Sequence, residues 1–414
     1  MVSRRHKRHY LLILLSAAVL PMAAQALNDA DVASAAPNTA RHLRAITQLL
    51  ASNRLHGRDN KTPESALAQH VLIRLLQRYG AGLSSGSADD AYQQPFTLNG
   101  NSGTNLLAVI RGRELPDEYV AVGAHYDHLG TRSNADGHCF ALGTPGGNIC
   151  NGATDNAAGV ATVLGIAEAI HSLPEPPRRS VILALWDSEE DGLVGSRYYV
   201  SHALVPLQQT VAYVNFDILG QDLLPSLKTT TFAVGSETGG AGLQQLVGDA
   251  AAGEALTVHR VSYLFGQERS DYKNFVDHKV PTVFFSDATG ACYHTTGDDL
   301  SIVNFTKMRA QARIAFRVVM NLAERSDRLP FAGRGSSPAV YTDAAAISQV
   351  LEAARADNQL FSADDNQLIA QVRDRTAAAV AAGPAAFDNT DILTLLGDTI
   401  AVVNALTRIE CRRF

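Results

Sequence analysis

Short apolar runs alternate with helical stretches along the middle of this chain, and this alternation limits the folds that it can adopt. Continuous apolar runs of this length are typical of strands buried on both faces. Strands that alternate with helices form a largely parallel sheet with helices on both faces. We therefore expect residues 27–326 to form an α/β three-layer sandwich with a central mixed, mostly parallel sheet. The apolar runs are 105–111, 119–124, 180–186, 211–216, 229–234 and 281–285, and the helical stretches are 157–171, 192–202, 240–252, 271–276 and 305–325.

Segments of different character flank this α/β region. Residues 37–79 carry apolar side chains at helical spacing, interrupted by the turn-rich HGRDNKTPES. Residues 327–342 contain the Gly, Pro and Ser residues typical of a linker. Residues 343–414 are Ala-rich and helical in pattern, without a motif that indicates chemistry. This helical C-terminal extension could be a cap, a secretion-linked segment or an autoinhibitor, but a packed, stabilising appendage is favoured.

The first 26 residues have the pattern of a secretory signal peptide. Arg4, Arg5, Lys7 and Arg8 precede the apolar run 10–20, and an A-x-A cleavage signal follows at 24–26. The apolar run is too short to span a bilayer. No later stretch is apolar enough to do so, so the mature chain is expected to be exported to the periplasm or secreted, without a membrane span.

Charge and cysteine content indicate which kinds of binding are not expected of this chain. The chain has 35 basic and 41 acidic residues, and removal of the four basic residues of 1–26 leaves 31 − 41 = −10. A mildly acidic chain without a basic stripe is not expected to bind nucleic acid. The four cysteines lack the C-x-x-C spacing of a zinc site, so disulfides are expected after export. Cys139–Cys150 is the favoured pair because both residues bracket one Gly- and Pro-containing loop, which leaves Cys292 with Cys411.

Five histidine and carboxylate side chains occur where an apolar run ends or a loop begins. Two imidazoles and three carboxylates without a thiolate suit catalytic zinc rather than a closed structural site. Strand ends are also where α/β sheets carry their site residues. We therefore expect one metal site built from His125 in AHYDHLG, Asp155 in GATDNAAG, Glu190 in WDSEEDG, Asp217 in VNFDILG and His294 in CYHTTGDD.

Each residue alone also has an ordinary structural interpretation. His125 could be a hydrogen-bonded core histidine, Asp155 a helix N-cap, and Glu189 and Glu190 a solvated surface pair. Five such placements in one chain favour the metal site. Within it, Asp127 could accept the second imidazole N–H of His125. Adjacent glutamates point in different directions, so one can bind metal while Glu189 faces the bound water.

In this order, the motifs H-x-D, D-N, E-E, N-x-D and Y-H-T resemble those of the co-catalytic zinc aminopeptidases of metallopeptidase family 28. The resemblance covers roughly residues 120–300 and excludes the chain after 330. It implies a zinc-exopeptidase-like fold, with a mixed eight-stranded sheet sandwiched by helices and the site at the strand ends. It also implies two zinc ions bridged by Asp155. Glu190 and His294 would complete one zinc site, His125 and Asp217 the other. Glu189 would be the general base, and Asp127 would orient His125.

Two features depart from this family pattern. Residues 131–150 lengthen the loop between the first two ligands. The family's transition-state tyrosine is not fixed by the sequence, because Tyr263 and Tyr293 both compete for this role.

The resemblance implies hydrolysis of N-terminal residues from peptides, with zinc-activated water, Glu189 as proton acceptor and a free substrate amine near the second zinc. A glutaminyl cyclase-like transferase with a single zinc is the first alternative. Carboxypeptidase action is a variant that Arg269 would support if it bound a substrate carboxylate. A non-catalytic binding domain on the same fold is less favoured, because the five ligand positions and Glu189 are all present.

Overall fold

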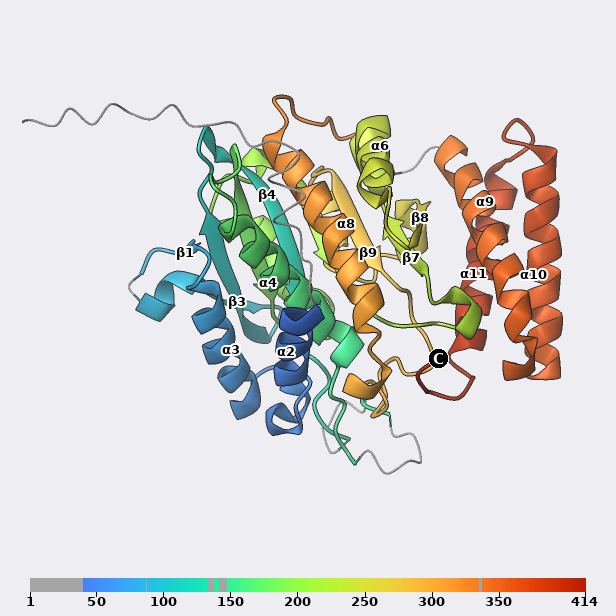
Figure 1. The fold of residues 1–414 in the computed structure, drawn as a ribbon, viewed down its shortest axis with the longest axis horizontal. Helices are drawn as coiled ribbons and strands as arrows, with labels where there is room; N and C mark the ends of the chain where they lie inside the picture. Colours follow the sequence, from blue (N-terminus) through green and yellow to red (C-terminus); the bar gives the residue numbers. More distant parts are fainter. Residues whose placement is uncertain (1–39, 87, 133–137, 141–146, 335–336) are drawn as a thin grey trace, which may run out of the picture.

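A computed structural model describes residues 40–86, 88–132, 138–140, 147–334 and 337–414. The expected signal peptide, residues 1–26, lies outside the described residues. A twisted sheet crosses the molecule, helices cover its two faces, and the long helices near the C-terminus stand beside one edge (Figure 1). Within the described residues, no helix has the length and apolar character needed to span a membrane.

The sheet is mixed, as the family resemblance implies, but within the described residues it has nine strands rather than eight. Across the described residues its strand order is β1-β3-β5-β4-β6-β9-β7-β8, with β2 paired to β3. The central strands β5, β4, β6 and β9 pair in parallel, and so do β7 and β8. Antiparallel pairs flank this centre at β3–β5 and β7–β9. The strands are β1 (Ala81–Gly82), β2 (Gln93–Leu98), β3 (Asn101–Ile110), β4 (Leu115–His125), β5 (Arg179–Trp186), β6 (Thr210–Phe216), β7 (Thr230–Val234), β8 (Thr257–Val261) and β9 (Thr282–Ser286).

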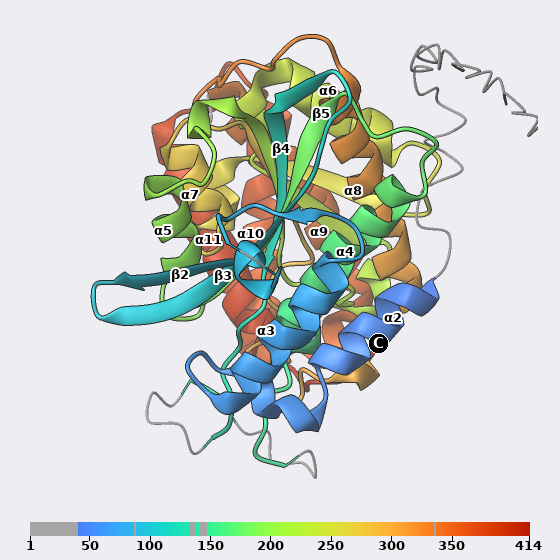
Figure 2. The same ribbon diagram turned by 90° about the vertical axis from the view of Figure 1, so that its left-hand side faces the viewer.

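Helices α2, α4 and α8 lie on one face of the sheet, and α5 and α7 lie on the other (Figure 2). Strand β5 is buried along its whole length and α4 along nearly all of its length, because both are apolar and lie between packed layers. Two separate apolar clusters fill the space above and below the sheet. The helices are α2 (Ala40–Leu50), α3 (Pro63–Leu76), α4 (Ala158–His171), α5 (Val194–Ser201), α6 (Gly240–Ala251), α7 (Tyr272–Asp277) and α8 (Phe305–Glu324). The expected three-layer α/β fold is confirmed.

Three strands were not predicted from the sequence. Strand β1 has two residues, and β2 pairs only with β3 and alternates buried with more exposed positions. Strand β8 ends the sheet and is partly exposed. None of these strands forms the continuous apolar run that marks a doubly buried strand, which is why the pattern missed them.

The C-terminal extension consists of α9 (Ser337–Ala354), α10 (Ala363–Ala382) and α11 (Asn389–Leu406). Helix α9 begins inside the stretch expected to be a linker, so the described non-helical part is shorter than predicted. A proline near the start of a helix loses no hydrogen bond, so Pro338 is compatible with this early start. The extension packs beside β7 and β8 (Figure 1), with α9 against β8.

Candidate metal centre

Three neighbouring parallel strands deliver most of the predicted ligands to one edge of the sheet. Strand β4 ends at His125, and Asp217 follows the last residue of β6. Strand β5, which pairs with β4 in parallel, ends at Trp186, just before the turn that holds Glu189 and Glu190. Because parallel strands end at the same edge of a sheet, these side chains meet there.

Asp155 reaches the same place from the loop before α4. The next residue, Asn156, donates from Nδ2 to the Phe216 carbonyl at 2.8 Å, and its Oδ1 accepts the Gly159 N–H at 3.0 Å. A Cβ at Gly159 would lie only 2.0 Å from Asn156 Oδ1, so glycine is required for this close approach of α4 to the end of β6. These contacts fix Asp155 beside Asp217.

The five predicted ligands lie together, with Asp155 between the two histidines. Asp155 Oδ1 is 3.2 Å from His125 Nε2, and Asp155 Oδ2 is 3.3 Å from His294 Nε2. His125 Nε2 is also 3.3 Å from Asp217 Oδ1. His294 Nε2 is 3.1 Å from Glu190 Oε2. Each histidine therefore faces one oxygen of Asp155 and one further carboxylate.

The distances between these ligand atoms fit two metal cations that the five side chains bind together. Zinc bonds of 2.0–2.2 Å at a tetrahedral angle place neighbouring ligand atoms about 3.4 Å apart. His294 Nε2 is buried and faces one carboxylate oxygen of Asp155 and one of Glu190, which suits a nitrogen that binds a metal together with these carboxylates. Three carboxylates and two imidazoles form the hard and borderline donor set that zinc accepts. The residues present therefore fit zinc.

Burial and the neighbouring histidines shift the pKa values of the carboxyl groups in opposite directions. Burial alone would raise the pKa of Asp155, but hydrogen bonds from His125 and His294 hold it well below its usual range. Burial would likewise raise the pKa of Glu190, yet His294 and His128 bring it down to about 2. Burial raises the pKa of Glu189 well above its usual value, and the carboxylates around it add to that effect. The pKa of Glu189 is thus shifted in the opposite direction from those of Asp155 and Glu190.

Glu189 is adjacent to the ligands but less closely engaged than they are. Its Oε2 is 4.0 Å from His125 Nε2. It can also form a ligand group with His125 and Asp217, while His125, Asp155 and Glu190 form another. Glu189 lines the pocket that opens beside the metal centre.

Asp127 lies behind His125 and links two ligand loops. Its Oδ1 is 3.6 Å from His125 Nδ1 and accepts the Glu189 N–H at 3.1 Å. Its Oδ2 accepts the Glu190 N–H at 3.2 Å. The nearest acceptor for His125 Nδ1 is instead the Asp127 backbone carbonyl at 3.1 Å. Asp127 thus orients the two glutamates as well as the histidine.

Three further buried residues support the site and were not predicted. His128 Nδ1 lies 2.8 Å from Glu190 Oε1, the oxygen that does not face His294. Arg58 donates to backbone carbonyls of the His125 and Asp155 loops, including Tyr126 and Gly152. Asp298 accepts the N–H groups of Thr154 and Asp155. Of these, His128 and Asp298 lie within the motifs AHYDHLG and CYHTTGDD, whereas Arg58 lies in no motif.

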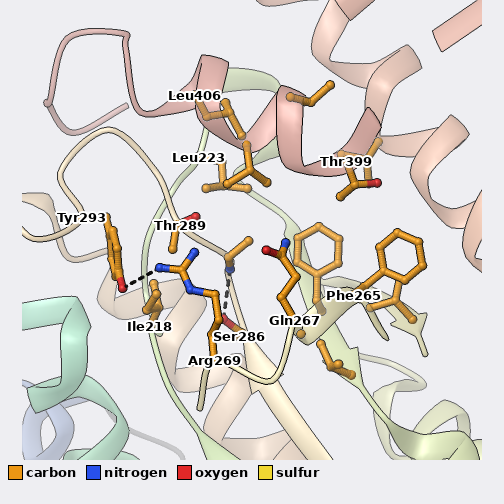
Figure 3. Close-up of a pocket in the computed structure, with 18 of the residues that line it drawn as sticks. Ile218, Leu223, Phe265, Gln267, Arg269, Ser286, Thr289, Tyr293, Thr399 and Leu406 are labelled. Atoms are coloured by element: carbon orange, nitrogen blue, oxygen red, sulfur yellow. Dashed lines mark hydrogen bonds between the residues drawn. The ribbon is translucent and has the colours of Figure 1, made fainter. Parts of the chain in front are cut away.

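The two candidate tyrosines occupy different environments. Tyr293 stacks on His294 with ring centres 3.7 Å apart and lines the same pocket as Glu189. Its hydroxyl accepts a hydrogen bond from Arg269 Nη2 at 3.1 Å (Figure 3). Tyr263 instead donates to Glu268 at 2.9 Å. Tyr293 is therefore the tyrosine that lies at the metal centre.

Both predicted disulfides are present, and both hold the His294 loop. Cys292 is bonded to Cys411, and Cys139 to Cys150. Next to Cys139, the Phe140 N–H donates to the His294 carbonyl at 2.9 Å. The described part of the long 131–150 loop therefore forms part of the wall around this ligand.

The sequence is similar to known peptidases. A family model described as Peptidase family M28 matches residues 105–319. The mouse protein "Aminopeptidase NAALADL1" is 35% identical over 120 residues, which cover 28% of this chain and only 13% of the mouse protein. The chain therefore spans a small part of that relative's length.

Two solved structures are similar in fold. The LapA aminopeptidase of Legionella pneumophila aligns with a TM-score of 0.55 at 17% identity, covering 72% of this chain and 75% of that one. A glutaminyl cyclase of Porphyromonas gingivalis aligns with a TM-score of 0.54 at 16% identity, covering 68% and 98%. At these identities the likeness shows the fold alone.

Proposed function

Because the chain belongs to peptidase family M28, we propose that it is an exported zinc-dependent aminopeptidase that removes N-terminal residues from peptides. The observation that carries this proposal is the position of Asp155 between two histidines, each paired with a further carboxylate. This arrangement supports two ligand sets, Glu190 with His294 and Asp217 with His125, which share Asp155 as a bridge.

When bound, zinc ions supply a water of lowered pKa and polarise the scissile carbonyl. Glu189 accepts the proton of the attacking water and returns it to the leaving amine, because it lines the pocket beside the ligands, with its Oε2 4.0 Å from His125 Nε2.

Tyr293 stabilises the tetrahedral oxyanion by donating a hydrogen bond from its hydroxyl group. Burial raises the pKa of Tyr293, so its hydroxyl stays protonated. Arg269, which donates to the tyrosine oxygen, polarises that hydroxyl further. The carboxylates around the second metal position bind the free α-amine of the substrate. This contact would explain why hydrolysis releases the N-terminal residue of a peptide.

Export is part of this proposal. The charged and apolar pattern of residues 1–26 supports secretion, and the two disulfides are compatible with an oxidising compartment.

A panel of aminoacyl-coumarin substrates, assayed with chelator and then with added zinc, tests the proposed activity. We expect hydrolysis that chelator abolishes and zinc restores, with about two zinc ions per chain. One zinc ion with cyclisation of N-terminal glutamine and no peptide hydrolysis would instead establish the transferase. Hydrolysis only of C-terminally free peptides, lost on Arg269→Met substitution, would establish a carboxypeptidase.

A further inference from the structure

The C-terminal extension contributes directly to the pocket beside the metal centre. This pocket has a volume of about 180 Å³ and is lined at one end by Asp155, Glu189, Glu190 and Asp217. Ten of its thirty lining residues belong to the extension, which lies outside the family match at 105–319. Figure 3 shows Leu406 of α11 beside Leu223 and Thr399 of α11 toward Phe265, with Arg269 and Tyr293 across the pocket.

We propose that this extension is a specificity element, which forms the wall of the site for the side chain of the substrate's N-terminal residue and selects bulky apolar residues. The proposal rests on the aminopeptidase function and deepens it. If the substrate amine and scissile carbonyl lie at the carboxylate end, the side chain of the same residue extends into the apolar part of the pocket.

The chemistry of the wall selects apolar groups. The extension contributes Val350, Leu351 and Ala354 from α9, and Val402, Val403 and Leu406 from α11. Its polar lining residue, Thr399, already donates its hydroxyl to the Leu395 carbonyl at 2.8 Å. A charged substrate side chain would therefore lose its hydration without gaining a partner from the extension, which is costly.

The size of the pocket favours a bulky group over a small one. An engineered apolar cavity of roughly 150 Å³ holds benzene, so about 180 Å³ accommodates the side chain of leucine or phenylalanine. An alanine methyl group would leave most of this apolar surface uncovered. A longer peptide segment would bring backbone N–H and C=O groups against side chains that cannot bond them.

The extension is attached to the catalytic domain at several points, as a fixed wall requires. Cys411 is bonded to Cys292, two residues before His294. At the start of α9, Asp343 Oδ1 accepts the Ser262 N–H at 2.6 Å. Just after α9, Asp357 accepts the Ser226 N–H at 2.9 Å. Apolar contacts of Leu406 with Leu223 and its neighbours close the remaining side.

Two adjacent alanines in α9 offer a matched test. Ala354 lines the pocket, whereas Ala353 is exposed on the same helix. In the full-length zinc-loaded chain, we expect Ala354→Phe to lower kcat/KM for leucyl- and phenylalanyl-coumarin at least about tenfold, with less than about threefold loss for alanyl-coumarin. Ala353→Phe should leave all three within about twofold. Equal losses on all three substrates, or equal behaviour of both variants, would overturn the proposal.

Val402→Ala provides the opposite change if Ala354→Phe does not fold. It enlarges the pocket, so the ratio of kcat/KM for tryptophanyl- over leucyl-coumarin should rise, and an unchanged or lower ratio contradicts the proposal. Calorimetric titration with L-phenylalaninol and L-alaninol separates this test from turnover. Preferential phenylalaninol binding that Ala354→Phe removes would support the pocket assignment even if no substrate were hydrolysed. Absence of hydrolysis would refute only the aminopeptidase function. Equal binding of both amino alcohols to the unmodified chain would overturn the pocket assignment.

Discussion

Cys292 is covalently bonded to Cys411, so the end of the chain is fixed to the loop that carries a metal ligand. The two cysteines are 119 residues apart, and the loop that they close contains α9, α10 and α11. A bond that closes so long a loop removes much conformational freedom from the unfolded chain. It also couples the extension to the geometry of the metal centre.

We expect replacement of both Cys292 and Cys411 by serine to lower the free energy of unfolding by about 2–5 kcal/mol. Denaturant unfolding of the zinc-loaded protein measures this loss. The matched control is serine replacement of Cys139 and Cys150, which are only 11 residues apart. Because loop entropy grows with length, the control should lose less stability. A larger loss in the control would contradict the entropic argument.

Replacement of Glu189 by glutamine should abolish proton transfer while leaving the metal bound. The amide keeps the size of the side chain but cannot accept the proton of the attacking water, so we expect kcat to fall about 10²- to 10⁴-fold. Metal analysis of the purified variant should give the same zinc content as the unmodified chain.

Asp191→Asn is the control for Glu189→Gln, because Asp191 is an exposed neighbour in the same turn. We expect its turnover to stay within about twofold. Unchanged turnover in the Glu189 variant would refute its role as the base, and loss of zinc would make it a ligand, as its position near His125 and Asp217 permits.

Asp127→Asn should weaken metal binding, because Asp127 orients His125 and accepts the N–H groups of both glutamates. Loss of such a supporting carboxylate typically costs 10- to 100-fold in metal affinity, and we expect a change of about this size. Competition with a chromophoric chelator measures the zinc affinity directly. Affinity equal to that of the unmodified protein would show that the backbone carbonyl of Asp127 alone is sufficient to hold His125.

The sequence predicted the centre of the fold well because burial on both faces leaves a strong local signal. Strand β5 and helix α4 are apolar through nearly their whole length. His125 and Asp217 could be placed because each follows such a run directly. Partly exposed strands such as β8 lack this signal and were missed.

The pocket could not be predicted, since it depends on contacts between distant segments. Leu223 and Leu406 are unremarkable apolar residues in the sequence, and only tertiary packing brings them together. Arg58 likewise has no local mark of its buried position under two ligand loops. Tyr293 and Tyr263 were equivalent by motif and are separated only by what their rings contact.

The attachment of α9 to β8 makes stability depend on pH. Burial raises the pKa of Asp343 from 3.8 to about 8, although the hydrogen bonds from Ser262 act in the opposite direction. The folded protein therefore retains a proton that the unfolded chain releases. This contribution to stability is fully present below about pH 4 and is lost as the pH rises toward 8. Burial also raises the pKa of Glu237 to about 7, which adds an effect of the same sign.

Asp343→Asn should remove the Asp343 contribution, because the amide is neutral at every pH. Between pH 5 and pH 8, we expect the unfolding free energy of the unmodified chain to fall more steeply than that of the variant, by up to about 1.4 kcal/mol per pH unit. Urea unfolding at pH 5, 6.5 and 8 measures both slopes. Asp117→Asn, which neutralises an exposed carboxylate, should keep the steeper slope. Parallel slopes for the unmodified chain and Asp343→Asn would mean that Asp343 is already ionised in the folded protein at pH 5.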